Sequence, residues 1–184
     1  MIASPPPDPD PVYAAIDLIP DHEAKHLLLN LARTVPGVAD EVIAYARKQA
    51  AAEDHEAIAE AVFSGLDSLD VDDLYTHSGR TRDGYVDICD EAWRMIEEEV
   101  EEAVTEMKKL QEHGFHKAAR EYCIGIMEGA ARYRNAGSGV LEWAVDAPDN
   151  CIREVCDEFC TGEKSASVKK KMQERCRGLV RSWE

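Results

Sequence analysis

A long run of helical periodicity constrains this chain more than any other feature. Between about residues 87 and 113, apolar side chains recur every three or four positions and share one face of a helix. They are Cys89, Trp93, Ile96, Val100, Ala103, Met107 and Leu110. The opposite face is acidic and includes EEEVEE at 97–102. The pattern predicts one long helix whose acidic run solvates an exposed face, with a cation site on that run as the weaker alternative.

The same spacing continues through most of the chain from about residue 17. No segment shows the strict alternation of apolar and polar residues that is typical of a half-buried β-strand. Helix-breaking pairs such as Pro36–Gly37, and Gly114 after the long helix, divide the pattern into short segments. We therefore predict an all-α fold of about seven or eight helices, built as stacked antiparallel αα-hairpins in a small α-solenoid or an irregular helical bundle.

The ends of the chain differ from its middle in composition. Residues 1–14 are rich in proline and aspartate, so we expect a disordered tail there. Residues 15–184 are expected to form a single helical, repeat-like domain that ends in a basic helix at about 164–183. The segment DLYTHSGRTRDGYVD, at 73–87, is expected to be an irregular connector between helices.

Near the start of the helical region, HEAKH at 22–26 matches the H-E-x-x-H pattern of zinc metallopeptidases. In that pattern two histidines one helical turn apart bind zinc and the glutamate acts as general base, here His22, His26 and Glu23. The alternative is a structural helix with Asp21 as its N-cap. An apolar stripe formed by Ala24, Leu27, Leu28, Leu31, Ala32 and Val35 faces away from both histidines. Because Lys25 lies inside the motif and no strand is predicted to align a peptide, we favour the structural helix and expect no metal or cofactor.

The net charge of −16 argues against a large surface for nucleic acid. The charge is uneven, since residues 163–184 hold seven lysines and arginines against three acidic residues. Nucleic-acid binding through Lys169–Arg181 is therefore a weak alternative, and docking of this helix on the acidic remainder of the chain is at least as consistent with the pattern.

Six cysteines are spread among the helical patterns. The N-terminal segment lacks the basic and apolar regions of a signal peptide, and no apolar run is long enough to span a membrane. We therefore expect a cytoplasmic protein with reduced thiols. Cys151, Cys156 and Cys160 have a spacing that suggests a metal site, but Cys156 and Cys160 share the apolar face of a predicted helix. Buried thiols packed between helices are the preferred interpretation.

The connector SGRTRDGYVD combines two arginines with a tyrosine between helices. Guanidinium groups bind carboxylates and phosphates through two parallel hydrogen bonds, so Arg80 and Arg82 could bind an acidic partner. The other interpretation is internal: the arginines pair with acidic helices, Asp87 caps the long helix and Tyr85 anchors the turn. Trp93 follows one helical turn into the long helix.

The same connector carries a resemblance to a known family. SGRTRDGYVD, the long helix and LQEHGFHKAAREYC follow one another, and the hairpin HEAKHLLLNLARTVPGVADEVIAYARKQAA precedes them. Together, over roughly residues 21–160, they resemble the helical region of bacterial and archaeal SWIM zinc-finger proteins and their uncharacterised relatives. The zinc finger of that family, C-x-C followed by C-x-H, is absent from this chain. The resemblance implies a helical module for protein contacts and transfers no catalytic residue.

The function expected from these observations is a non-enzymatic, cytoplasmic α-helical repeat protein that binds a protein partner. Arg80, Arg82, Tyr85 and Trp93 are the expected partner-binding residues. The alternative from another class is a zinc-dependent hydrolase that uses His22, Glu23 and His26.

Overall fold

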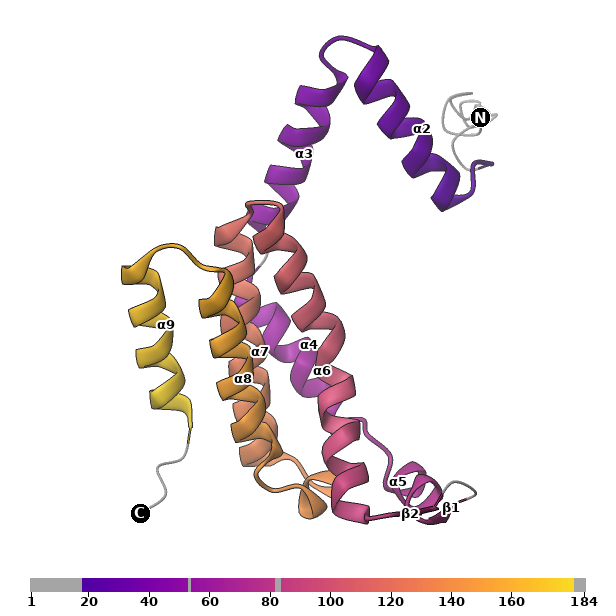
Figure 1. Ribbon diagram of the computed structural model, residues 1–184, viewed down its shortest axis with the longest axis vertical. Helices are drawn as coiled ribbons and strands as arrows, with labels where there is room; N and C mark the ends of the chain where they lie inside the picture. Colours follow the sequence, from indigo (N-terminus) through magenta and orange to yellow (C-terminus); the bar gives the residue numbers. More distant parts are fainter. Residues whose placement is uncertain (1–17, 53, 82–83, 181–184) are drawn as a thin grey trace, which may run out of the picture. The chain divides into compact units, whose positions relative to one another are not determined.

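The computed structural model describes residues 18–52, 54–81 and 84–180, and nearly all of them are helical (Figure 1). Within these ranges the chain forms eight α-helices, one short 3-10 helix and one pair of very short strands. The all-α prediction is therefore confirmed, with a two-stranded sheet that it did not include. No helix in the described ranges combines the length and the apolar character that crossing a bilayer requires.

Residue contacts divide the chain into two units at residue 48, whereas the sequence led us to expect one domain over 15–184. The first unit holds α2 (Asp21–Thr34) and most of α3 (Val38–Ala52). The second unit holds the remaining elements. Its elements are α4 (His55–Asp67), α5 (Val71–His77), β1 (Gly79–Thr81), β2 (Gly84–Val86), α6 (Ile88–Glu112), α7 (His116–Ala136), η1 (Gly139–Trp143), α8 (Ala147–Gly162) and α9 (Ala166–Leu179).

The second unit is a helical bundle in which α6, α7 and α8 lie side by side (Figure 1), α4 packs on α6 and α7, and α9 packs on α7 and α8. The apolar stripe predicted for the long helix is buried at Ile96, Val100 and Met107, which supplies much of the core. Trp93 packs at the edge of this core. Cys89 is exposed, against the prediction, because it lies in the first turn of α6 beside the cap.

Two glycines bring α4 and α7 unusually close together. A Cβ atom built on Gly125 would lie 2.6 Å from the Cβ of Ile58, and one on Gly129 would lie 2.7 Å from the carbonyl oxygen of Ala59. Real Cβ atoms do not approach other atoms so closely, so only glycine fits at these two positions. The absence of side chains lets the α7 backbone touch α4 directly.

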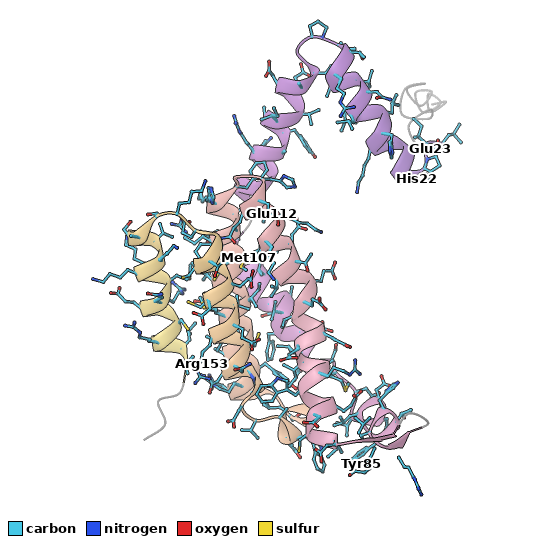
Figure 2. The ribbon with its side chains drawn as sticks, in the orientation of Figure 1. His22, Glu23, Tyr85, Met107, Glu112 and Arg153 are labelled. Atoms are coloured by element: carbon cyan, nitrogen blue, oxygen red, sulfur yellow. The ribbon has the colours of Figure 1, made fainter. Side chains whose placement is uncertain are left out.

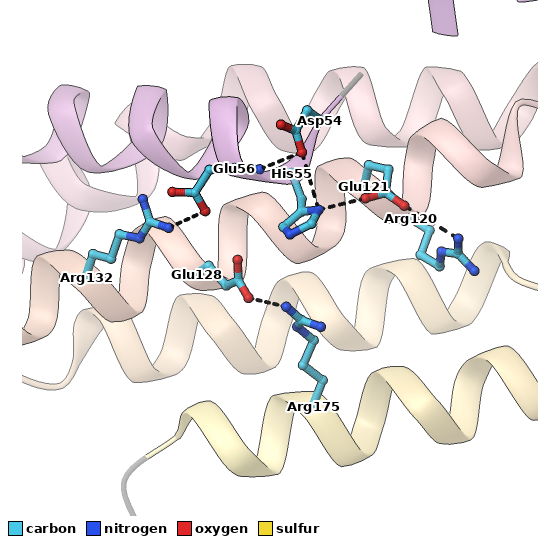
Figure 3. Close-up of polar contacts among 8 residues, drawn as sticks. All are labelled: Asp54, His55, Glu56, Arg120, Glu121, Glu128, Arg132 and Arg175. Carbon is cyan, nitrogen blue, oxygen red and sulfur yellow. Dashed lines mark hydrogen bonds and ion pairs between the residues drawn. The ribbon is translucent and has the colours of Figure 1, made fainter. Parts of the chain in front are cut away.

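Polar contacts flank this close crossing and connect α7 to its neighbours (Figure 3). The ring Nδ1 of His55 on α4 donates to Glu121 on α7 over 2.9 Å. Arg132 on α7 reaches back to Glu56 over 2.7 Å. On α7 between Glu121 and Arg132, Glu128 pairs with Arg175 of α9. These pairs fix the order of the helices around α7, although the exposed ones contribute little to stability individually.

The helix ends follow the expected chemistry in most places. The carboxylate of Asp54 accepts the backbone N–H of Glu56 at the start of α4, and Asp87 accepts that of Cys89 over 2.8 Å at the start of α6. After α6, Gly114 has φ +80° and terminates the helix as predicted. The N-cap predicted at Asp21 is wrong: α2 begins at Asp21 itself, and Pro20 occupies the cap position.

The described residues of the connector predicted to be irregular, 73–81 and 84–87, belong largely to regular elements. Its first part belongs to α5, and β1 and β2 then form an antiparallel hairpin in which Arg80 lies opposite Tyr85. Strands of three residues are too short to show an alternating pattern, which explains why sequence periodicity did not reveal them.

Candidate interaction surface

Exposed aromatic side chains gather at one end of the bundle. The exposed large apolar residues of the second unit, within the ranges that the structure describes, are Tyr75, Tyr85, Trp143 and Val145. They come from α5, from β2, from the last residue of η1 and from the segment that joins η1 to α8, all of which lie near the start of α6 (Figure 1). We call Tyr75, Tyr85, Trp143, Val145 and Arg80 the aromatic end.

The rings of Tyr75 and Trp143 form the fixed part of this surface. Their centroids lie 6.2 Å apart, and the rings meet edge to face at 78°. Such a pair is favourable beyond its contact area, because the positive edge of one ring meets the negative face of the other. Tyr75 nevertheless stays 55% exposed and Trp143 37% exposed. The pair therefore presents a preorganised apolar surface.

Buried neighbours along the chain hold both rings in place. Leu74, directly before Tyr75, is fully buried, and the carboxylate of Asp70 caps α5 by accepting the N–H of Asp72 over 2.8 Å. Val140 and Leu141 of η1 are buried just before Trp143. Because the anchors point inward, the residues next to them are directed outward. The surface is thus a consequence of how α5 and η1 attach to the core.

The β-hairpin adds the two residues that the sequence singled out. Tyr85 is 76% exposed, and Arg80 is exposed across from it (Figure 2 labels Tyr85). The internal pairing considered for the arginines is not seen for Arg80, because its side chain forms no hydrogen bond or ion pair with the described residues. Arg82 lies outside the described residues.

Trp93, the fourth residue expected to bind a partner, lies in a different setting from Arg80 and Tyr85. Its side chain is half-buried against the core, and its indole N–H donates to Glu97 over 2.6 Å. The structure therefore groups Arg80 and Tyr85 with two residues that sequence reasoning missed, Tyr75 and Trp143. The sequence signal that could have identified them is an aromatic residue next to, or two positions after, an aliphatic residue that the core buries.

The histidine pair of HEAKH lies on an exposed part of α2 in the first unit (Figure 2 labels His22 and Glu23). The Nδ1 of His26 donates to the backbone carbonyl of His22 over 2.9 Å, and the Nε2 of His22 lies 3.9 Å from the carboxylate of Glu23. Over the described ranges, no three His, Cys, Asp or Glu side chains are arranged to hold a metal ion. The sequence therefore matches the H-E-x-x-H pattern, but the described residues provide no third ligand for a metal ion.

The cysteines of α8 pack between helices as predicted. Cys151, Cys156 and Cys160 are all buried, because α8 contacts α6, α7 and α9 on different sides. Burial raises the pKa of the Cys151 thiol to about 12, and it also raises the pKa values of Cys156 and Cys160. Thiols that resist deprotonation are poor nucleophiles, so these residues fit a structural role.

The acidic face of α6 forms one wall of a cavity of about 460 Å³ between α6 and α8. Val100, Val104 and Val155 contribute its apolar lining, and exposed glutamates surround them. Arg94 crosses this face and hydrogen-bonds both Glu91 and Glu98. The arrangement agrees with the interpretation that the acidic run solvates the outer side of a long helix.

Comparison with known proteins adds no relative: no family model, curated protein sequence or solved structure matches this chain significantly. The resemblance to the helical region of SWIM zinc-finger proteins therefore stays a prediction from the sequence.

Proposed function

We propose that this chain is a non-enzymatic, cytoplasmic helical module that binds a protein partner through the aromatic end. The observation that carries the proposal is the exposed, edge-to-face pair of Tyr75 and Trp143, together with Arg80 on the hairpin that follows α5, whose exposed side chain pairs with none of the described residues. Tyrosine, tryptophan and arginine are the residue types that dominate the binding energy of protein interfaces.

The geometry supports recognition by a rigid surface. Both rings follow residues that are buried in the bundle, so little conformational entropy is lost when a partner covers them. Arg80 adds a charged, bidentate donor from the same end of the bundle, which favours a partner that presents both apolar side chains and a carboxylate. The kinship with SWIM-associated helical regions is part of the same proposal and would place the chain among modules for protein contacts.

Partner capture from an extract of the native host tests this function. The double variant Arg80→Ala/Tyr85→Ala removes two exposed side chains that make no core contact. We expect the wild type to retain a defined set of proteins, identified by mass spectrometry, and the double variant to lose most of that set.

The matched control is Lys170→Ala, which removes a positive charge on α9 whose side chain is 79% exposed. It should retain the same proteins as the wild type, and all three proteins should give the same far-UV circular dichroism spectrum. Equal capture by the double variant and the wild type would contradict the proposal. A loss of helical signal in the double variant would assign these residues to the fold instead.

A further inference from the structure

The first unit carries an apolar helix face that its own residues do not cover. Leu27, Leu28 and Leu31 of α2, and Val35 at its C-cap, repeat at helical spacing, and they are between 39% and 46% exposed. The sequence predicted this stripe to be buried, and the structure contradicts that prediction. We call these four residues the leucine face.

A pair of helices this short needs an additional surface to be stable. α2 and α3 have 14 and 15 residues, and isolated helices of that length are marginal in water. α3 contributes Val38, Val42 and Ala46, which are only half-buried, and the leucine face stays exposed as well. Fewer than about 40 residues rarely form a core without help such as oligomerisation. The leucine face is therefore a surface that requires an occupant.

The charge distribution favours a second copy of this chain as the occupant. Residues 18–48 hold four acidic and four basic residues and are neutral, whereas residues 49–184 hold 30 acidic and 17 basic residues, a net charge of −13. Two bundles repel each other, so the neutral unit is the part through which two copies can approach. The large exposed apolar residues of the bundle, within the described ranges, all belong to the aromatic end. Its rings and its arginine differ in shape and polarity from a row of leucines.

From these observations we propose that the chain forms a homodimer in which the leucine faces of two α2 helices pack against each other. Such a contact is isologous, since the same patch on both copies meets about a two-fold axis. It closes after two copies and leaves the aromatic end of each copy free for another partner. The dimer does not depend on the proposed function.

Sedimentation velocity of the full-length protein over a concentration series tests the dimer. We expect the wild type to sediment with the mass of two chains at high concentration and to dissociate on dilution. Leu28→Gln/Leu31→Gln places two polar amides in the leucine face and should give a monomer at every concentration measured. Leu28→Met/Leu31→Met keeps the face apolar and should remain a dimer.

The matched control is Leu29→Gln, because Leu29 belongs to the same helix, is 48% exposed, and projects about 145° away from the leucine face by helical geometry. This variant, like Trp143→Ala at the aromatic end, should dimerise as the wild type does. A wild type that is monomeric throughout the series would overturn the proposal, and slow amide exchange of α2 in that monomer would show that the chain's own bundle covers the face. Dissociation caused by Leu29→Gln or by Trp143→Ala would overturn it as well.

Discussion

The crossing of α4 and α7 and the leucine face of α2 both have regularly spaced apolar residues, but these residues are buried in the first region and exposed in the second. In the crossing, Gly125 and Gly129 bring the backbones together and the neighbouring side chains are buried. On α2 the spacing of apolar residues is just as regular, yet Leu28 and Leu31 remain exposed. Periodicity therefore identifies which side of a helix is apolar, and it does not say whether anything covers that side. The following predictions test how far the two regions differ.

The largest effect is expected at the buried ion pair of the bundle. Arg134 on α7 pairs with Asp149 on α8 and also donates to the carbonyl oxygen of Leu179 over 2.7 Å, and both charged side chains are over nine-tenths buried. Asp149→Ala leaves a buried positive charge without its counter-charge, so we expect a loss of about 3–5 kcal/mol in the free energy of unfolding by urea. Glu56→Ala, which removes the exposed partner of Arg132, should lose less than about 1 kcal/mol. Equal losses in the two variants would contradict this ranking.

Truncating one leucine in each region compares them directly. Leu74 is fully buried in the second unit, so Leu74→Ala should destabilise the bundle by about 2–5 kcal/mol. Leu28 lies on the exposed face of α2, so Leu28→Ala should change the unfolding of the bundle by less than about 1 kcal/mol. The measurement is thermal unfolding of both variants at low protein concentration. A large loss from Leu28→Ala would mean that the two regions are not energetically separate.

Adding a single methyl group tests the close helix crossing. Gly129→Ala should lower the free energy of unfolding by about 1–3 kcal/mol, because the new Cβ atom would meet the α4 backbone and Val62. We expect this loss of stability although alanine has a higher helix propensity than glycine. Gly178→Ala on α9 is the matched control: its Cβ atom meets nothing within 4 Å, so the variant should be as stable as the wild type or more so by up to about 1 kcal/mol. A stable Gly129→Ala protein would show that α4 and α7 can separate at little cost.

A smaller, pH-dependent effect is expected at Glu91. Its carboxylate is buried and accepts a hydrogen bond from Arg94 over 3.0 Å, and this bond lowers the pKa of Glu91 below its ordinary value of 4.5. A lowered folded-state pKa stabilises the protein above the unfolded-state pKa, and that contribution is lost as pH falls through the folded-state value. The stability difference between the wild type and Glu91→Gln should therefore be largest near neutral pH and shrink below about pH 4.5. A difference that grows on acidification would contradict this assignment.

No change at all is expected when metal is removed. Because His22 and His26 have no third ligand among the described residues, purified untagged protein should contain no stoichiometric zinc, and a chelator should leave its melting temperature unchanged. Stoichiometric zinc that disappears in the His26→Ala variant would instead support the metallopeptidase hypothesis.

The long helices were predictable because apolar residues recur at helical spacing over many turns of each one. Ile96, Val100 and Met107 are buried as the stripe on α6 required, and Gly114 ends that helix because the backbone there has φ +80°. The strands and the aromatic end were not predictable in this way. Three residues carry no usable period, and whether Tyr75 or Trp143 faces outward depends on which neighbour the core accepts.

The glycines were missed for a related reason. A glycine inside a helix ordinarily weakens it, and only the position of α4, a distant segment of the chain, explains why Gly125 and Gly129 are favourable. The exposure of Leu28 was missed because a sequence pattern contains no information about the surface opposite it. Both failures concern contacts between elements, which the sequence of one element does not encode.

The distribution of the six thiols makes Cys89 a natural position for a chemical probe. It is exposed in the first turn of α6, whereas four of the others are buried and Cys176 is half-buried, with its thiol donating to the backbone of Ile152. A maleimide fluorophore should therefore attach to Cys89 first, although desolvation and, after it, the nearby carboxylate of Asp87 raise the pKa of that thiol and will slow the reaction. Since the label would lie at the end of the bundle where the exposed rings gather, its emission can report partner binding in the native sequence.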